Sequence, residues 1–149
     1  MRKWQPGAED DKTQTHPYDD MLERLHLARK NGTVKGILWH QGESDGKMGI
    51  NGTYAQALAA LITRVRTECA DPNVPIIIGQ LGQFPERPWS EGRIKVDQAH
   101  RQVAEQIGNA AFASSKGLKD RGDQTHFDAA SARLLGKRFA EKMIELQQQ

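Results

Sequence analysis

The segment VPIIIGQL, residues 74–81, decides the fold. Its apolar residues follow one another almost without a break, whereas a half-buried strand would alternate apolar and polar positions. A run of this kind is typical of a strand that is buried on both faces, as in a parallel sheet. Residues 34–39 and 110–113 are shorter runs of the same character, and they predict two more strands, the first of them also buried.

Four segments with helical spacing alternate with these strands. Their predicted starts carry residues that suit a first turn or an N-cap: Pro17, Thr53, Ser90 and Asp128. The first three helices are expected to stop near Asn31-Gly32, Asp71-Pro72 and Gly108, while residues 1–16 are expected to be loop. Strands that alternate with helices predict an α/β fold in which helices cover a parallel sheet.

The composition fits one domain over residues 1–149, with 37% hydrophobic and 27% charged residues. A net charge of +2, with dispersed basic residues, gives no reason to expect a nucleic-acid partner. No apolar run reaches the roughly 20 residues that span a bilayer, so no membrane partner is expected. The first twelve residues lack the apolar core of a secretory signal. Cys69 is the only cysteine, and its helical context favours a buried, inert thiol.

Two loops are expected at the carboxyl ends of the strands, where open α/β sheets form their sites. The first, WHQGESDG at 39–46, contains a G-x-S-x-G pattern around Ser44, and the order Ser44, Asp123, His126 is that of an α/β-hydrolase triad. However, the glycines after Ser44 delay the next helix, and a nucleophile elbow must turn directly into one. We therefore interpret Ser44 as a loop hydroxyl bonded to nearby backbone.

The second loop, GDQTHFD at 122–128, places a carboxylate three residues before an imidazole. A catalytic imidazole needs a carboxylate that fixes its tautomer, and Asp123 can fold back onto His126 to do so. In the alternative interpretation, Asp123 and Asp128 only shape a surface turn and cap the last helix. The spacing leaves both interpretations open.

Together the two loops resemble the SGNH hydrolase superfamily, in its sialate O-acetylesterase and carbohydrate acetylesterase branch. The matching segments run along most of the chain: WQPGA at 4–8, HPYDD at 16–20, WHQGESD at 39–45, GDQTHFDAAS at 122–131 and LGKRFAE at 135–141. The resemblance implies a flavodoxin-like three-layer α/β/α sandwich with a parallel sheet. It also implies hydrolysis of acetyl esters on sugars, with no metal or organic cofactor.

The resemblance also assigns roles to individual residues. His126 becomes the general base and Asp123 its orienting partner. Gln41 takes the place of an oxyanion-hole side chain, because its amide can donate to a developing oxyanion. Gly42 permits close backbone approach, and Glu43 is expected to be a buried, hydrogen-bonded organiser of the loop.

The nucleophilic serine of the family is missing from this chain. The resemblance places that serine in a Gly-Gln-Ser-Asn-type run after the first strand, and no serine here follows Gly-Gln. The sheet is therefore expected to lack its first two strands, and the chain to be a fragment or inactive as it stands. The free edge of the strand at 34–39 predicts marginal stability or self-association. The localisation stays open.

Two rival interpretations remain. In the first, a metal-dependent hydrolase uses two imidazoles and two carboxylates at one end of the sheet to hold Zn²⁺ or Fe²⁺: His40, Glu43, Asp123 and His126. In the second, the chain is a non-catalytic carbohydrate-binding or partner protein on the same fold, whose tryptophans stack on sugar rings: Trp4, Trp39 and Trp89.

Overall fold

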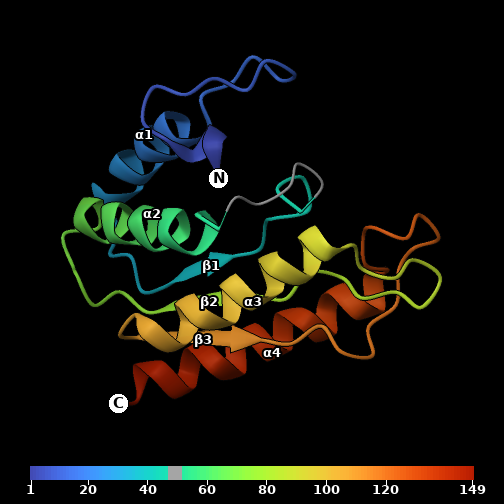
Figure 1. Ribbon diagram of the computed structural model, residues 1–149. Helices are drawn as coiled ribbons and strands as arrows, with labels where there is room; N and C mark the ends of the chain where they lie inside the picture. Colours follow the sequence, from blue (N-terminus) through green and yellow to red (C-terminus); the bar gives the residue numbers. More distant parts are fainter. Residues whose placement is uncertain (47–51) are drawn as a thin grey trace.

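The computed structural model describes residues 1–46 and 52–149 (Figure 1). The elements follow in the order η1 (Arg2–Trp4), α1 (Pro17–Arg29), β1 (Ile37–Trp39), α2 (Tyr54–Glu68), β2 (Ile76–Gly79), α3 (Glu91–Gln106), β3 (Ala110–Ala113) and α4 (Ala129–Gln147). The predicted alternation of helices and strands is confirmed. The prediction of loop throughout residues 1–16 is wrong at the short 3₁₀ helix η1.

The first two strands are shorter than the apolar runs that predicted them. Val74 and Leu81 are fully buried, but both lie outside the paired residues of β2. In this segment the apolar run therefore extends beyond the paired residues of the strand, and its buried ends lie outside them.

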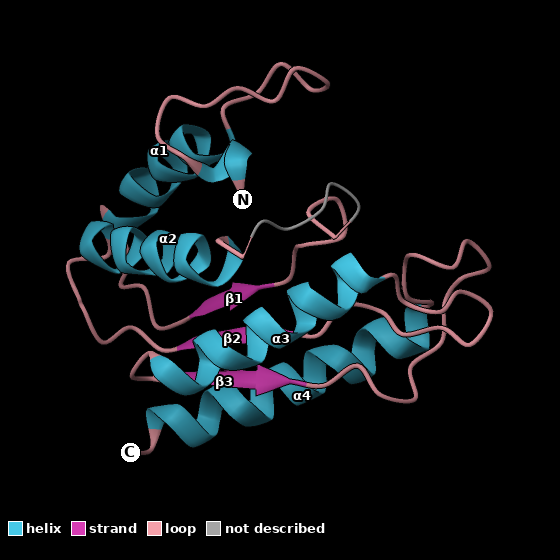
Figure 2. Ribbon diagram, viewed as in Figure 1, coloured by secondary structure: helices cyan, strands magenta, loops and turns pink. Residues whose placement is uncertain are grey.

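The sheet is parallel, with the strand order β1-β2-β3 (Figure 2). All four residues of β2 are buried, which confirms the prediction from its apolar run. Ile76 and Ile78 belong to one core cluster and Ile77 to another, because successive side chains of a strand point to opposite faces.

Helices cover both faces of this sheet. The cluster around Ile76 and Ile78 takes most of its buried helical residues from α2 and α3 and one, Tyr18, from α1, whereas the cluster around Ile77 takes them from α4. Figure 1 shows α1 beside α2, farther from the sheet. The predicted three-layer α/β/α sandwich is confirmed.

The helix starts agree with the sequence signals, although their hydrogen bonding differs. The Ser90 side chain accepts from Arg93 N, and that of Asp128 accepts from Ser131 N, as N-caps do. Thr53 precedes α2, but its hydroxyl makes no capping hydrogen bond. Within residues 1–46 and 52–149, no helix is both long and apolar enough to cross a membrane.

Strand β1 lies at the edge of the sheet, and the prediction that it is buried is wrong at its middle residue. Leu38 is 62% exposed. It is aligned with Ile77, so it points to the face on which α4 packs against β2 and β3. Trp39 points to the opposite face, beneath α2 and α3, and is buried.

Candidate active site

The loops after β1 and β3 meet at the carboxyl edge of the sheet, toward which the arrows in Figure 2 point. The His40 ring, in the first loop, lies 5.8 Å from the Phe127 ring, in the second. Phe84, from the segment after β2, lies 5.7 Å from the same Phe127 ring. Aromatic contacts thus hold together the segments that follow all three strands.

In the second loop, Asp123 and His126 form the pair that their spacing suggested. The Asp123 Oδ2 atom lies 2.7 Å from His126 Nδ1, and Oδ1 accepts from the backbone N–H of His126 at 2.8 Å. Arg121 Nε also donates to Oδ2, at 2.8 Å. The backbone N–H of His126, its ring and the Arg121 guanidinium hold the pKa of Asp123 well below its usual range. The side chain of His126 is 65% exposed, so solvent or substrate reaches the ring.

Hydrogen bonds within the second loop fix its shape. Asp120 accepts from the backbone N–H groups of Gly122 and Gln124. Arg121 N donates to His126 O, and Asp128 N donates to Lys119 O, each at 3.0 Å. Asp123 therefore shapes the turn and also contacts the ring, and its role as the orienting partner of a catalytic base stays a prediction.

The first loop is a tight turn between residues 42 and 46. Gly46 N donates to Gly42 O at 2.9 Å. The side-chain amide of Gln41 donates to Asp45 Oδ2 at 3.0 Å, which leaves its second N–H for another acceptor. Glu43 Oε2 accepts from Gly42 N at 3.1 Å, as expected of an organiser of the loop. Glu43 is only half-buried, however, because the turn carries it along the surface.

Beneath this turn lie two buried residues that the sequence analysis did not identify. Tyr54 Oη lies 3.2 Å from Gln41 O and 3.0 Å from His100 Nε2. Burial lowers the pKa of His100 to about 4 and is also the main cause that raises the pKa of Tyr54. One signal was available: His100 interrupts the apolar stripe of its helix, between Val96 and Val103.

The same turn packs directly against the start of α3. A Cβ atom on Gly92 would lie 2.0 Å from Gly46 O, so only glycine fits there. A groove of about 420 Å³ lies beside this contact, and Arg87 and Arg93 are among the residues that line it. Arg87 Nη1 also donates to Thr125 Oγ1 at 3.1 Å, which ties the groove to the second loop.

None of the serines in the described residues is hydrogen-bonded to His126. Ser44 is exposed on the turn, and the two described residues that follow it, Asp45 and Gly46, are turn and not helix, whereas a nucleophile elbow turns directly into a helix. Ser90 caps α3, while Ser115 bonds to Gln80 and Leu81.

The rival metal site is not assembled. Among residues 1–46 and 52–149, no group of three or more potential metal ligands lies close enough to hold an ion. His40 instead places Nε2 3.1 Å from Gln80 O.

The tryptophans are engaged in packing. Trp39 is buried, and Trp4 packs edge-on against it with the ring centroids 5.1 Å apart. Trp89 donates its indole N–H to Gly82 O.

A parallel α/β/α sandwich with an Asp-x-x-His pair at its carboxyl edge defines an SGNH-type α/β protein. The model of one family, described as carbohydrate esterase, sialic acid-specific acetylesterase, matches residues 1–145. The chain belongs to this family.

Two comparisons place it among known proteins. A probable carbohydrate esterase of Arabidopsis thaliana, At4g34215, is 28% identical over 150 residues, which cover 97% of this chain and 51% of the relative. The X-ray structure of the Arabidopsis protein AT4G34215 superposes with a TM-score of 0.78 at 25% identity, over 96% of this chain and 55% of that one. The chain thus spans about half the length of the relatives it matches.

Proposed function

We propose that this chain carries the base and the oxyanion-binding part of a serine esterase site that removes acetyl groups from carbohydrate. The hydrogen bond of 2.7 Å between Asp123 and His126 carries this proposal, because it is the pairing that a catalytic imidazole requires. Family membership and the name of the Arabidopsis relative support the substrate class.

In the proposed mechanism, the nucleophilic serine comes from outside these 149 residues. His126 Nε2 takes the serine proton as the serine oxygen attacks the acetyl carbonyl carbon. Gln41 donates an amide N–H to the oxyanion that forms. His126 then returns the proton to the departing sugar oxygen, and a water molecule repeats the sequence to release acetate. Asp123 stabilises the imidazolium at each stage.

The test is an acetate-release assay on an O-acetylated sugar. The chain is measured alone and after co-expression with a polypeptide that carries the Gly-Gln-Ser-Asn run of a longer relative. We expect release only from the combination, and we expect His126→Ala to remove it. The matched control is His26→Ala, because His26 forms another exposed imidazole–carboxylate pair, 2.8 Å from Glu68.

Acetate release that persists in His126→Ala, or that disappears equally in His26→Ala, would contradict the proposal. So would the absence of release from every combination. Binding of the sugar without release of acetate would favour the non-catalytic carbohydrate-binding alternative.

A further inference from the structure

Tyr54 and His100 form a buried hydrogen-bonded pair that ends on the backbone of the first loop. Tyr54 is the first residue of α2 and is 4% exposed, while His100 lies in α3 and is fully buried. Two helices that are separate in sequence thus contribute one polar contact to the Gln41 carbonyl. Helices α2 and α3 contact each other, and in Figure 1 this loop lies near one end of each.

The number of available protons fixes the direction of these hydrogen bonds. Tyr54 has one hydroxyl proton, which it donates to Gln41 O. Its oxygen must then accept from His100, so the His100 proton resides on Nε2 and Nδ1 is an acceptor without a partner in the described residues. In the reverse arrangement, neither an Nδ1–H donor nor the Gln41 carbonyl would have a partner among residues 1–46 and 52–149. Buried donors without partners are rare, which favours the first arrangement.

The peptide group between Gln41 and Gly42, which accepts this hydrogen bond, is constrained by two hydrogen bonds and by close packing at Gly42. Gly42 has a φ of +146°, and a Cβ atom there would lie 2.7 Å from Val96 Cγ1 and 3.1 Å from Tyr54 Oη. The Gln41 carbonyl accepts from Tyr54, and the Gly42 N–H donates to Glu43. The backbone of Gln41 therefore has one orientation, and its side chain starts from a fixed point.

We infer that Tyr54 and His100 are positioning residues, which fix the Gln41–Gly42 peptide and thereby direct the Gln41 amide at the oxyanion. Neither residue contacts the substrate. They act through two consecutive hydrogen bonds, the first from His100 Nε2–H to Tyr54 Oη and the second from Tyr54 Oη–H to Gln41 C=O. The catalytic consequence rests on the proposed function, whereas the hydrogen-bond chain itself does not.

The experiment uses ¹⁵N-labelled protein and Tyr54→Phe, which keeps the ring and removes the hydroxyl. We expect a ring-nitrogen spectrum with the His100 proton on Nε2 in the parent. In Tyr54→Phe we expect a displaced Gly42 amide nitrogen resonance and about ten-fold faster exchange of that amide, because the neighbouring carbonyl has lost its donor. In the acetate-release assay, kcat should fall about ten-fold while KM stays the same.

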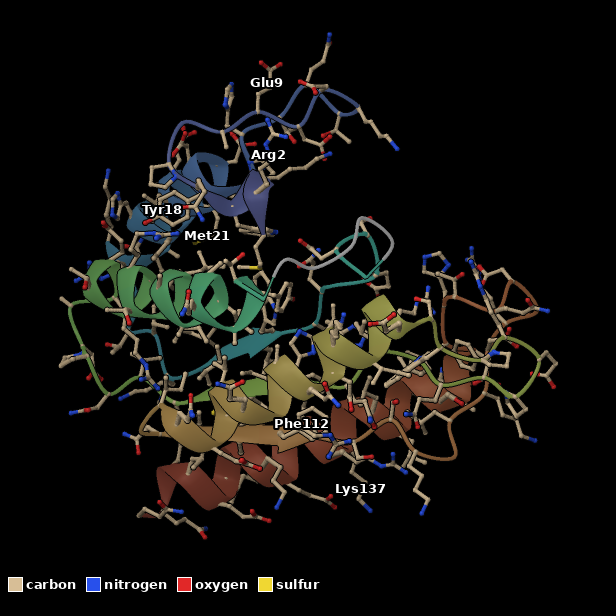
Figure 3. The ribbon with its side chains drawn as sticks, in the orientation of Figure 1. Arg2, Glu9, Tyr18, Met21, Phe112 and Lys137 are labelled. Carbon is tan, nitrogen blue, oxygen red and sulfur yellow. The ribbon has the colours of Figure 1, made fainter. Side chains whose placement is uncertain are left out.

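Three further variants separate positioning from packing. Tyr18→Phe is the matched control, because Tyr18 is also 4% exposed but belongs to α1 (Figure 3). The Arg64 guanidinium lies 5.4 Å from its ring. Tyr18→Phe should leave the Gly42 resonance unchanged. His100→Gln retains an N–H donor for Tyr54 and should restore most of the parent behaviour, whereas His100→Leu should not.

An unchanged Gly42 resonance in Tyr54→Phe would overturn the inference, as would a His100 proton on Nδ1. An unchanged kcat beside a displaced resonance would also overturn it, since the contact would then have no catalytic effect. If the resonances behave as expected and the parent releases no acetate in any combination, the proposed function fails and the hydrogen-bond chain stands.

Discussion

The two loops of the site are held in place in different ways. The loop after β3 is fixed by its own residues: Asp120, Asp123 and Asp128 accept from backbone N–H groups no more than four positions away. The loop after β1 also has local hydrogen bonds, but in addition it is held from the core. Tyr54, 13 residues from Gln41 in sequence, bonds to the Gln41 carbonyl and to His100, which is 59 residues from Gln41.

This difference predicts which substitutions change only the reaction and which also change the stability of the fold. The second loop is exposed and locally determined, so substitutions there should change the reaction and leave the fold intact. The first loop rests on the core, so substitutions beneath it should change both. Each of the following predictions tests one side of this comparison.

The largest effect is expected in the second loop, from Asp123→Asn. The asparagine oxygen still accepts the backbone N–H groups, but the side chain no longer favours the tautomer and charge that His126 needs. The corresponding substitution in a serine protease triad lowers kcat by about 10⁴. We expect a loss of comparable size in the acetate-release assay, with the melting temperature unchanged. A variant that melts well below the parent would mean that this loop also supports the fold.

The next largest effect is expected from His100, which lies beneath the first loop and should make the free energy of unfolding depend on pH. Burial lowers the pKa of His100 from 6.5 to about 4, so the unfolded chain binds a proton there that the folded chain excludes. The free energy of unfolding should therefore decrease as the pH falls from 6.5 toward 4, by on the order of 3 kcal/mol.

Urea unfolding at several pH values measures this decrease, and His100→Gln should lose it in that window. Equal pH dependence in the parent and in His100→Gln would assign the effect to other groups.

A pair of glycine substitutions compares the two loops directly. Gly42 and Gly122 both have positive φ, +146° and +100°. A Cβ atom on Gly42 would collide with Val96, whereas one on Gly122 would have nothing within 4 Å. We expect Gly42→Ala to lower the free energy of unfolding by about 2–3 kcal/mol and Gly122→Ala by about 1 kcal/mol. Equal losses would show that backbone strain, and not packing, dominates at both positions.

The features that could be predicted from the sequence are those that depend on residues close together in the chain. The starts of α1, α3 and α4 follow from Pro17, Ser90 and Asp128. The spacing of Asp123 and His126 allowed the pairing that the structure shows, although it left a purely turn-shaping role open. These are interactions within one helical turn or one loop. Roles for Gln41, Gly42 and Glu43 came only from the family resemblance and remain predictions.

The contacts of Tyr54 with His100 could not be predicted, because they depend on how two helices pack. The exposure of Leu38 is a similar case, since an apolar run does not reveal which strand of a sheet will lie at its edge. In both cases the sequence shows the character of the residue, and only the tertiary arrangement shows its neighbours.

The smallest effect on stability is expected at the edge strand that carries the first loop. Leu38 is 62% exposed, so Leu38→Lys should change the free energy of unfolding by less than about 1 kcal/mol. It should nevertheless reduce self-association, because a charge on an edge strand discourages pairing with another chain. Sedimentation of the parent and the variant measures this. A parent that is already a monodisperse monomer with a high melting temperature would contradict the predicted edge association.

The central claim is that these residues supply the base of an esterase site and that the nucleophile lies elsewhere. Treatment of the 149-residue chain with a fluorophosphonate, followed by mass spectrometry of its peptides, tests this claim most directly. The claim predicts that no serine reacts faster in the folded chain than in the urea-unfolded chain. Rapid labelling of Ser44 that disappears in His126→Ala would contradict it.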